Sequence, residues 1–254
     1  MQYGVCNLSI VPLRIEPSDA SELVSQVLYG EHFKVLEQRK NWCRIRLAFD
    51  KYEGWIDTKQ YFEITEDIYY KLNEEQPKIA TDLVEFVNDE NDQLYTVPLG
   101  ATLNSLDILN HTHDGNISDS ILPKSNLINT ALTYLNAPYL WGGKTPFGID
   151  CSGLTQMVYK LNGYKIFRDA SQQATQGEPL SFIEESEAGD LAFFDNNEGK
   201  IVHVGIIMND NYIIHAHGKV RIDRLDHSGI YNVDKNTHTH KLRVIKKSHI
   251  THCL

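Results

Sequence analysis

The first sixty residues alternate apolar and polar positions in short runs, which is the two-residue period of β-strands. Turn-forming residues separate the runs, among them Pro17, Gly30 and Asp50. Strands are predicted at residues 9–13, 22–29, 32–38, 42–48 and 53–56. Several short strands joined by tight turns predict a small all-β barrel over residues 1–62.

Four sequence runs in this barrel resemble a bacterial SH3-type domain. They are Val11-Pro12-Leu13-Arg14, Leu28-Tyr29-Gly30-Glu31, Trp42-Cys43-Arg44-Ile45 and Tyr52-Glu53-Gly54-Trp55-Ile56. Residues 63–120 are less regular, with strand-like runs at 83–87 and 93–97 around the acidic segment 88–92. A structureless connection of that length is uncommon in a compact protein, so we interpret residues 63–120 as a second, degenerate SH3-like barrel.

From Ser125 the apolar residues recur at helical spacing, which predicts a helix with Ser125 as its N-cap and Pro138 as its stop. A second helix is predicted to begin near Cys151 and to end at Gly163. Strands are then expected at residues 191–194, 202–208, 212–215, 220–222 and 242–245. Helices followed by antiparallel strands indicate an α+β domain over residues 121–254.

Charge narrows the range of partners for this chain of 254 residues. Its 24 Lys and Arg face 34 Asp and Glu, giving a formal net charge of -10, which argues against nucleic acid as a partner. There is no apolar run of about 18 residues, so no membrane span is expected, and the first residues lack the pattern of a signal peptide. We expect a cytoplasmic protein, or a periplasmic or secreted one if an export signal precedes this sequence.

The four cysteines, at positions 6, 43, 151 and 253, have no C-x-x-C spacing, which suits a reducing compartment. Cys151 differs from the others because it stands at a predicted helix start, where the helix dipole lowers a thiol pKa. A nucleophilic thiol also requires a base, and the predicted strands supply His203 and His215. The alternative for each of these three residues is an ordinary place in the core.

Five motifs in the last 130 residues resemble the NlpC family of papain-like cysteine peptidases. They are Pro138-Tyr139-Leu140-Trp141-Gly142-Gly143, Asp150-Cys151-Ser152-Gly153, Gly189-Asp190-Leu191-Ala192-Phe193-Phe194, His203-Val204-Gly205-Ile206 and Ile214-His215-Ala216. The resemblance implies a papain-like fold and cleavage of bacterial cell-wall peptides. It implies Cys151 as the nucleophile, His203 as the base, and His215 as the residue that orients the base. Tyr139 would lie beside the nucleophile.

The SH3-type front end is similar to that of the YkfC-like branch of the family. That branch consists of γ-D-glutamyl-L-diamino acid endopeptidases, which act on murein stem peptides with a free N-terminal L-Ala. The resemblance therefore implies a substrate such as L-Ala-γ-D-Glu-L-Lys or L-Ala-γ-D-Glu-meso-diaminopimelate, and the sequence does not choose between them. The implied substrate-binding residues are Tyr52, Glu16 in preference to Glu31, Tyr139, Asp150, Ser152, Asp169 and Ser171.

Two further interpretations remain open at this point. The chain could instead be a cell-wall-binding module with weak or acyl-transferase activity, since SH3-type domains serve as wall anchors. The histidines at 238 and 240 and the His and Cys residues of segment 249–253 contain zinc-ligand types, but their spacing fits no standard zinc site. We therefore expect them to be solvent-exposed, and we expect no metal and no cofactor.

Overall fold

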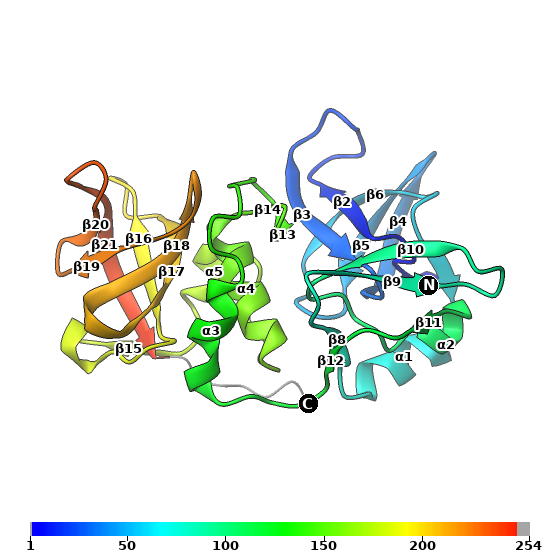
Figure 1. Cartoon of the computed structure of the whole chain (residues 1–254). Helices are drawn as coiled ribbons and strands as arrows, with labels where there is room; N and C mark the ends of the chain where they lie inside the picture. The colour runs from blue at the N-terminus through cyan, green and yellow to red at the C-terminus, as the bar shows by residue number, and fades with distance from the viewer. Residues whose placement is uncertain (1, 248–254) are drawn as a thin grey trace. The chain divides into compact units, whose positions relative to one another are not determined.

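A computed structural model describes residues 2–247 of the chain, which divide into two compact units (Figure 1). The first unit comprises residues 2–120 together with the short segment 141–145. The second comprises residues 121–140 and 146–247. No helix in the described part of the chain is both long enough and apolar enough to cross a bilayer.

The first unit is built on a seven-stranded antiparallel sheet in the order β3-β2-β6-β5-β4-β1-β7. Its strands are β1 Gln2–Val5, β2 Ile10–Arg14, β3 Leu23–Leu28, β4 His32–Arg39, β5 Trp42–Leu47, β6 Glu53–Asp57 and β7 Phe62–Ile64. The five strands predicted from alternation are confirmed to within two residues at each end. Strands β1 and β7 were missed because β1 has three buried residues in a row and β7 has three residues in all, so neither alternates.

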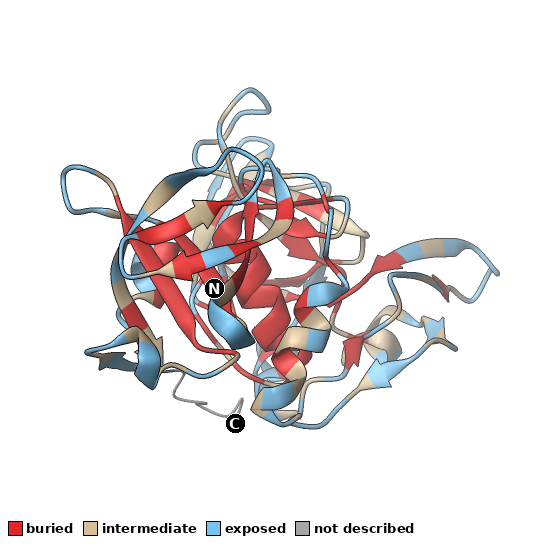
Figure 2. Ribbon diagram, turned by 60° about the vertical axis from the view of Figure 1, so that its left-hand side comes forward, coloured by how far each residue is buried: buried red, intermediate tan, exposed pale blue. Residues whose placement is uncertain are grey.

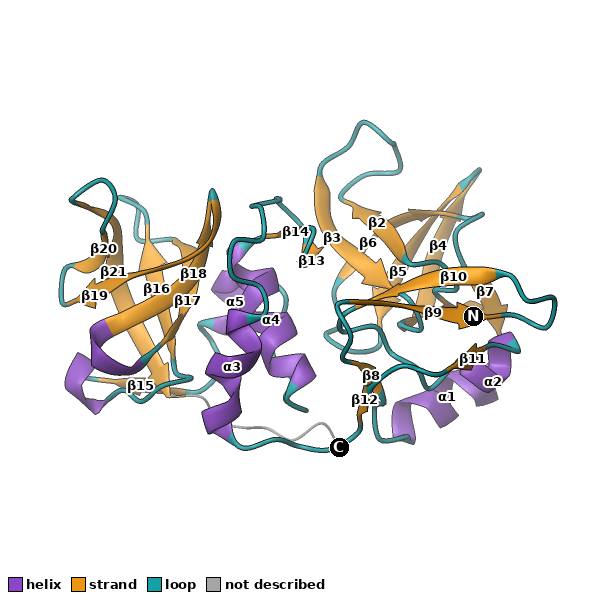
Figure 3. Ribbon diagram, viewed as in Figure 1, coloured by secondary structure: helices purple, strands orange, loops and turns teal. Residues whose placement is uncertain are grey.

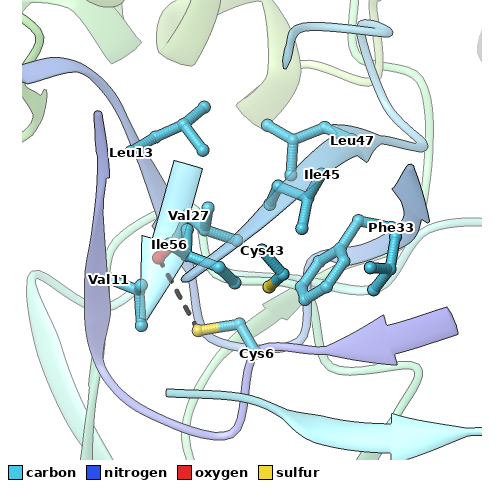
Figure 4. Close-up of a cluster of buried hydrophobic side chains, with 10 residues drawn as sticks. Cys6, Val11, Leu13, Val27, Phe33, Cys43, Ile45, Leu47 and Ile56 are labelled. Atoms are coloured by element: carbon cyan, nitrogen blue, oxygen red, sulfur yellow. Dashed lines mark hydrogen bonds between the residues drawn. The ribbon is translucent and has the colours of Figure 1, made fainter. Parts of the chain in front are cut away.

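The core of this sheet holds apolar side chains from five of its strands, and two cysteines lie among them (Figure 4). Cys6 and Cys43 are both fully buried. Burial raises the pKa of each thiol to about 12, so both are neutral at physiological pH. The Cys6 thiol donates to the carbonyl oxygen of Val27 at 3.7 Å. These two cysteines are therefore core residues.

Residues 63–120 contain a helix that the apolar pattern did not predict. Helix α1 (Glu66–Glu74) is capped by Thr65, whose side chain accepts from the amide of Ile68, and it buries Tyr69 and Leu72 against β1. The rest of the segment forms two small sheets, β10-β9-β11 and β12-β8, in place of one continuous barrel sheet. The remaining elements of the unit are β8 Ile79–Ala80, β9 Val84–Asn88, β10 Leu94–Pro98, α2 Leu106–Leu109, β11 Thr112–His113, β12 Ile117–Ser118 and β13 Lys144–Thr145.

The second unit contains a closed six-stranded antiparallel barrel (Figure 3). The strands run β16-β17-β18-β19-β20-β21, and β21 pairs back with β16 to close the ring. Their bounds are β16 Leu191–Asp195, β17 Ile201–Ile207, β18 Tyr212–His217, β19 Lys219–Asp226, β20 Gly229–Asn232 and β21 Thr237–Lys247. A three-residue strand, β15 (Glu178–Leu180), pairs with the end of β21. Strand β20 and the closure itself were not predicted.

Helices lie to one side of the barrel, and α4 (Cys151–Leu161) is buried along its whole length (Figure 2). Its predicted start and its stop near Gly163 are confirmed. The first predicted helix is shorter than expected, because α3 covers Leu127–Leu132. Ser125 is not its N-cap, since residues 124–126 form a 3₁₀ turn. The other elements are α5 Ala170–Gln173, β14 Gly148–Ile149 and the 3₁₀ turns η1 Lys124–Asn126, η2 Ile183–Glu185 and η3 Asn209–Asn211.

Candidate active site

Cys151 is the first residue of α4, directly after the N-cap Asp150. The Asp150 carboxylate accepts from the amide of Gly153 at 2.6 Å, which fixes where the helix begins. Burial raises the pKa of the Cys151 thiol to about 12, and the adjacent Asp150 carboxylate acts in the same direction. The expected lowering by the helix start is therefore wrong for the free protein, because loss of water around a thiolate outweighs the helix dipole. At neutral pH Cys151 is a thiol.

A buried ion pair lies at the N-terminus of this helix. Arg168 donates to both carboxylate oxygens of Asp150, at 3.0 and 2.6 Å, and to the hydroxyl of Ser152 at 2.9 Å. The Arg168 side chain is 1% exposed. Asp150 and Ser152, which were expected to bind substrate, are thus held together next to the nucleophile by Arg168, a residue to which the sequence analysis gave no role.

Three barrel residues form a hydrogen-bonded relay. Nε2 of His203 on β17 lies 2.8 Å from Nδ1 of His215 on β18, and Nε2 of His215 lies 3.0 Å from Oδ2 of Asp223 on β19. Arg221 donates to both oxygens of Asp223, at 2.6 and 2.8 Å, and the amide of Val233 donates to it at 3.1 Å. His203 is 5% exposed, while His215 and Asp223 are fully buried.

The relay determines where the protons sit. Burial acts to raise the pKa of Asp223, but hydrogen bonds from His215 and Arg221 hold it well below its usual range. An ionised Asp223 only accepts, so His215 carries its proton on Nε2 and presents a lone pair at Nδ1. His203 then donates from Nε2 to that lone pair. The ring nitrogen left with a free lone pair is Nδ1 of His203, which is the nitrogen a base requires.

Strand alternation places the relay inside the barrel. His203 is paired with Phe194, and Asp223 is paired with Ile213; both apolar partners belong to the buried barrel core. Burial lowers the pKa of His203 well below its ordinary value, and His215 adds to the effect. Both imidazoles are therefore neutral near pH 7, which leaves His203 free to accept a proton.

His240 is not the exposed residue that the sequence led us to expect. It lies on β21, half-buried, with its ring stacked on that of His203 at a centroid distance of 4.1 Å. Closure of the barrel between β21 and β16 brings it there, and that closure was not visible in the sequence. His238 is exposed, as expected, and it pairs with Asp226. The cluster at 249–253 lies outside the described residues.

Three other expected substrate contacts lie in the same unit. Tyr139 is half-buried; burial raises its pKa to about 12, and the nearby Cys151 acts in the same direction. Asp169 forms a capping box with Gln172 at the start of α5, and Ser171 is exposed on its first turn. Asp169 therefore has a structural role at the start of α5.

The two expected contacts from the first unit are Glu16 and Tyr52. Glu16 is exposed and lines a cavity of about 570 Å³ beside Trp55, and Tyr52 packs against the strand core. Glu31, the alternative to Glu16, is buried and accepts from Nζ of Lys144 at 3.0 Å. Its charge is already balanced, which favours Glu16 as the residue available to a ligand.

Segment 141–145 is bound within the first unit at several points. Nε1 of Trp141 donates to Glu22 at 2.7 Å, and the amide of Lys144 donates to the Gln26 side chain at 2.7 Å. Between them Gly142 has φ +77°, and a Cβ there would lie 2.5 Å from the Leu23 carbonyl oxygen. No other residue type fits this position without strain.

A thiol at the start of a buried helix, with an imidazole base oriented by a second polar side chain on an adjoining barrel, defines a papain-like cysteine peptidase. Comparison with known proteins agrees. Residues 136–240 match the NlpC/P60 family, and residues 13–60 match the bacterial dipeptidyl-peptidase SH3 domain. The chain belongs to the NlpC/P60 family of cysteine peptidases.

Two curated relatives resemble the chain over both units. Dipeptidyl-peptidase 6 of Lysinibacillus sphaericus is 32% identical over 250 residues, covering 84% of this chain and 88% of the relative. The gamma-D-glutamyl-L-lysine dipeptidyl-peptidase of Bacillus subtilis is 30% identical over 76% of this chain and 71% of its own length. The crystal structure of an NlpC/P60 family protein from Bacillus cereus has the same fold, with a TM-score of 0.79 over 96% of this chain and 99% of that one, at 21% identity.

Proposed function

We propose that the protein hydrolyses the bond between D-glutamate and the following L-diamino acid in murein stem peptides that carry a free N-terminal L-Ala. The relay from Asp223 through His215 to His203 is the observation that carries the chemistry, because it leaves a base lone pair at Nδ1 of His203. The bond specificity is supported by the relatives, which are named dipeptidyl-peptidases for γ-D-glutamyl-L-lysine.

The first chemical step begins from a neutral thiol. The Cys151 proton passes to Nδ1 of His203 as sulfur attacks the γ-carbonyl carbon of D-glutamate, which gives a tetrahedral oxyanion. The amide of Cys151, at the helix N-terminus, is available to donate to that oxyanion. His203 then returns the proton to the departing amine of the diamino acid as the carbon–nitrogen bond breaks, which leaves a thioester.

The second step releases the dipeptide. Water attacks the thioester carbon, His203 takes a proton from the water, and the carbon–sulfur bond breaks. The proton returns to the Cys151 sulfur, so the enzyme ends as it began. Throughout both steps Asp223 holds His215 in one tautomer, and His215 stabilises the imidazolium form of His203.

Recognition of the amino terminus would use acidic and polar groups. In peptidoglycan the L-Ala nitrogen is an amide, whereas in a released stem peptide it is an ammonium that needs acceptors and negative charge. Asp169, Tyr52 and Glu16 are the residues we assign to it. An acetylated amine would lack the charge and leave these acceptors unpaired.

The test compares two substrates on the full chain. L-Ala-γ-D-Glu-L-Lys should yield L-Ala-D-Glu and free lysine, while the N-acetyl tripeptide should have a kcat/KM at least ~10³-fold lower. Cys151→Ala serves as the inactive control. Products that retain the γ-D-Glu–Lys bond, or equal rates for both tripeptides, would refute the proposed specificity. The meso-diaminopimelate tripeptide, assayed in parallel, determines which diamino acid is preferred.

A further inference from the structure

Three histidines bring their ligand nitrogens together at one end of the barrel interior, beside an exposed fourth, His217, whose ring centroid lies 4.8 Å from that of His240, and the catalytic mechanism uses two of the three. The ring centroids of His203 and His215 are 5.0 Å apart, and those of His215 and His240 are 5.7 Å apart. One ligand nitrogen from each of the three rings lies within 4.8 Å of the other two. His240 has no part in the proton relay, so its position beside His203 needs a separate explanation.

We propose that His203, His215 and His240 form a binding site for a zinc ion, and that zinc bound there inhibits the enzyme. A tetrahedral zinc with bonds of about 2.0–2.1 Å to nitrogen holds its ligands roughly 3.4 Å apart. Nε2 of His203 and Nδ1 of His215 are 2.8 Å apart now, so this pair opens slightly, and the His240 ring turns out of its 4.1 Å stack on His203 to bind the same ion. Three imidazoles with water in the fourth position form a common zinc coordination set.

Asp223, the hydrogen-bond partner of His215, suits a metal site. A histidine that binds a metal almost always donates its other ring N–H to a carboxylate or carbonyl, which fixes the tautomer. Nε2 of His215 already makes this bond with Asp223, so its Nδ1 lone pair faces the cluster without any rearrangement. Nδ1 of His240 lies 2.9 Å from the Thr239 hydroxyl, which leaves its Nε2 for the metal.

Inhibition follows from where the proton on His203 must go. In the free enzyme that proton sits on Nε2 and Nδ1 is the base. When zinc binds at Nε2, the proton moves to Nδ1, so the ring has no free lone pair to accept the Cys151 proton, and no proton is released overall. The inhibition rests on the proposed function, whereas the binding of zinc does not.

Zinc binding is measured first on a variant that lacks the Cys151 thiol. Cys151→Ala, which removes the thiol as a ligand, should bind one zinc ion per chain by isothermal titration calorimetry. In the Cys151→Ala background, His240→Gln or His215→Gln should weaken the affinity for zinc at least ~10-fold. Adding His238→Gln, an exposed histidine two residues from His240 on the same strand, should leave it unchanged. Circular dichroism and thermal unfolding confirm that each variant is folded.

Two results would overturn the site: no zinc binding by Cys151→Ala, or equal affinity in the His240→Gln and His238→Gln backgrounds. The inhibition is tested on the wild type, where zinc should stop hydrolysis over the concentration range in which it binds Cys151→Ala, and EDTA should restore it. Zinc that binds without slowing hydrolysis would refute the inhibition. If no murein tripeptide is cleaved even without zinc, the proposed function fails while the binding result still stands.

Discussion

Arg168 donates to both carboxylate oxygens of Asp150, and neither side chain is more than 9% exposed. Because Asp150 also caps the helix that begins with Cys151, this ion pair links the position of the nucleophile to a residue seventeen positions further along the chain. A planar guanidinium is needed here, since a lysine ammonium cannot bind both oxygens and the Ser152 hydroxyl in one plane.

We therefore expect Arg168→Ala to destabilise the protein by about 3–5 kcal/mol, because it leaves a buried carboxylate without a partner. Urea unfolding followed by circular dichroism measures this change. The double variant with Asp150→Asn should recover part of the loss, since the uncompensated charge is gone. A loss below about 1 kcal/mol for Arg168→Ala would mean that water already solvates the pair.

Cys151→Ala should abolish peptide hydrolysis and leave the fold intact. Removing one sulfur from the first turn of α4 changes little packing, whereas the reaction loses its nucleophile. Cys43→Ala is the matched control, because it removes a buried thiol from the first-unit core and should keep most of the activity. Measurable turnover by Cys151→Ala, above that of a blank, would be incompatible with thiol catalysis.

The pH dependence of alkylation tests the state of the thiol. Iodoacetamide reacts with the thiolate, and burial raises the pKa of Cys151 to about 12. The alkylation rate at Cys151 should therefore increase about tenfold per pH unit from about pH 6 to about pH 9 without a plateau. A plateau beginning below about pH 6 would show instead a thiolate–imidazolium pair in the free enzyme.

Asp223→Asn should lower kcat at least ~10²-fold while KM changes little. An asparagine amide can donate to Nε2 of His215, which favours the opposite tautomer and reverses the direction of the relay. Asp226→Asn is the control on the same strand, because Asp226 pairs with the exposed His238. If Asp223→Asn and Asp226→Asn have similar kcat values, His215 does not need the carboxylate to orient it.

Local pattern was sufficient to place the nucleophile. Cys151 follows a helix-capping aspartate and precedes a run of apolar residues at helical spacing, so α4 and its start could be predicted. His203 and His215 could be placed on strands because their apolar neighbours form continuous buried runs. These features depend on residues within a few positions of one another.

Residues brought together by the barrel could not be predicted in the same way. Strands β18 and β19 pair so that Ile213 lies opposite Asp223, and this register turns Asp223 toward the relay. The sequence of neither strand alone predicts that register. The one sequence signal for Asp223 was the alternation of Arg221 and Asp223 with Val220 and Ile222. The position of His240 beside His203 depends on closure of the barrel, which pairs strands far apart in the sequence. The raised pKa of Cys151 depends on its burial, which cannot be predicted from a sequence motif.

The pairing of β16 with β17 sets Phe194 opposite His203, and side chains on these strands alternate between the inside and the outside of the ring. A slip of one position would turn His203 outward and Val204 inward. The hairpin turn at residues 196–200 joins the two strands and contributes to setting this register. A single-residue insertion or deletion in that turn that shifted the register would therefore take His203 out of the relay, even though every catalytic side chain remained in the sequence.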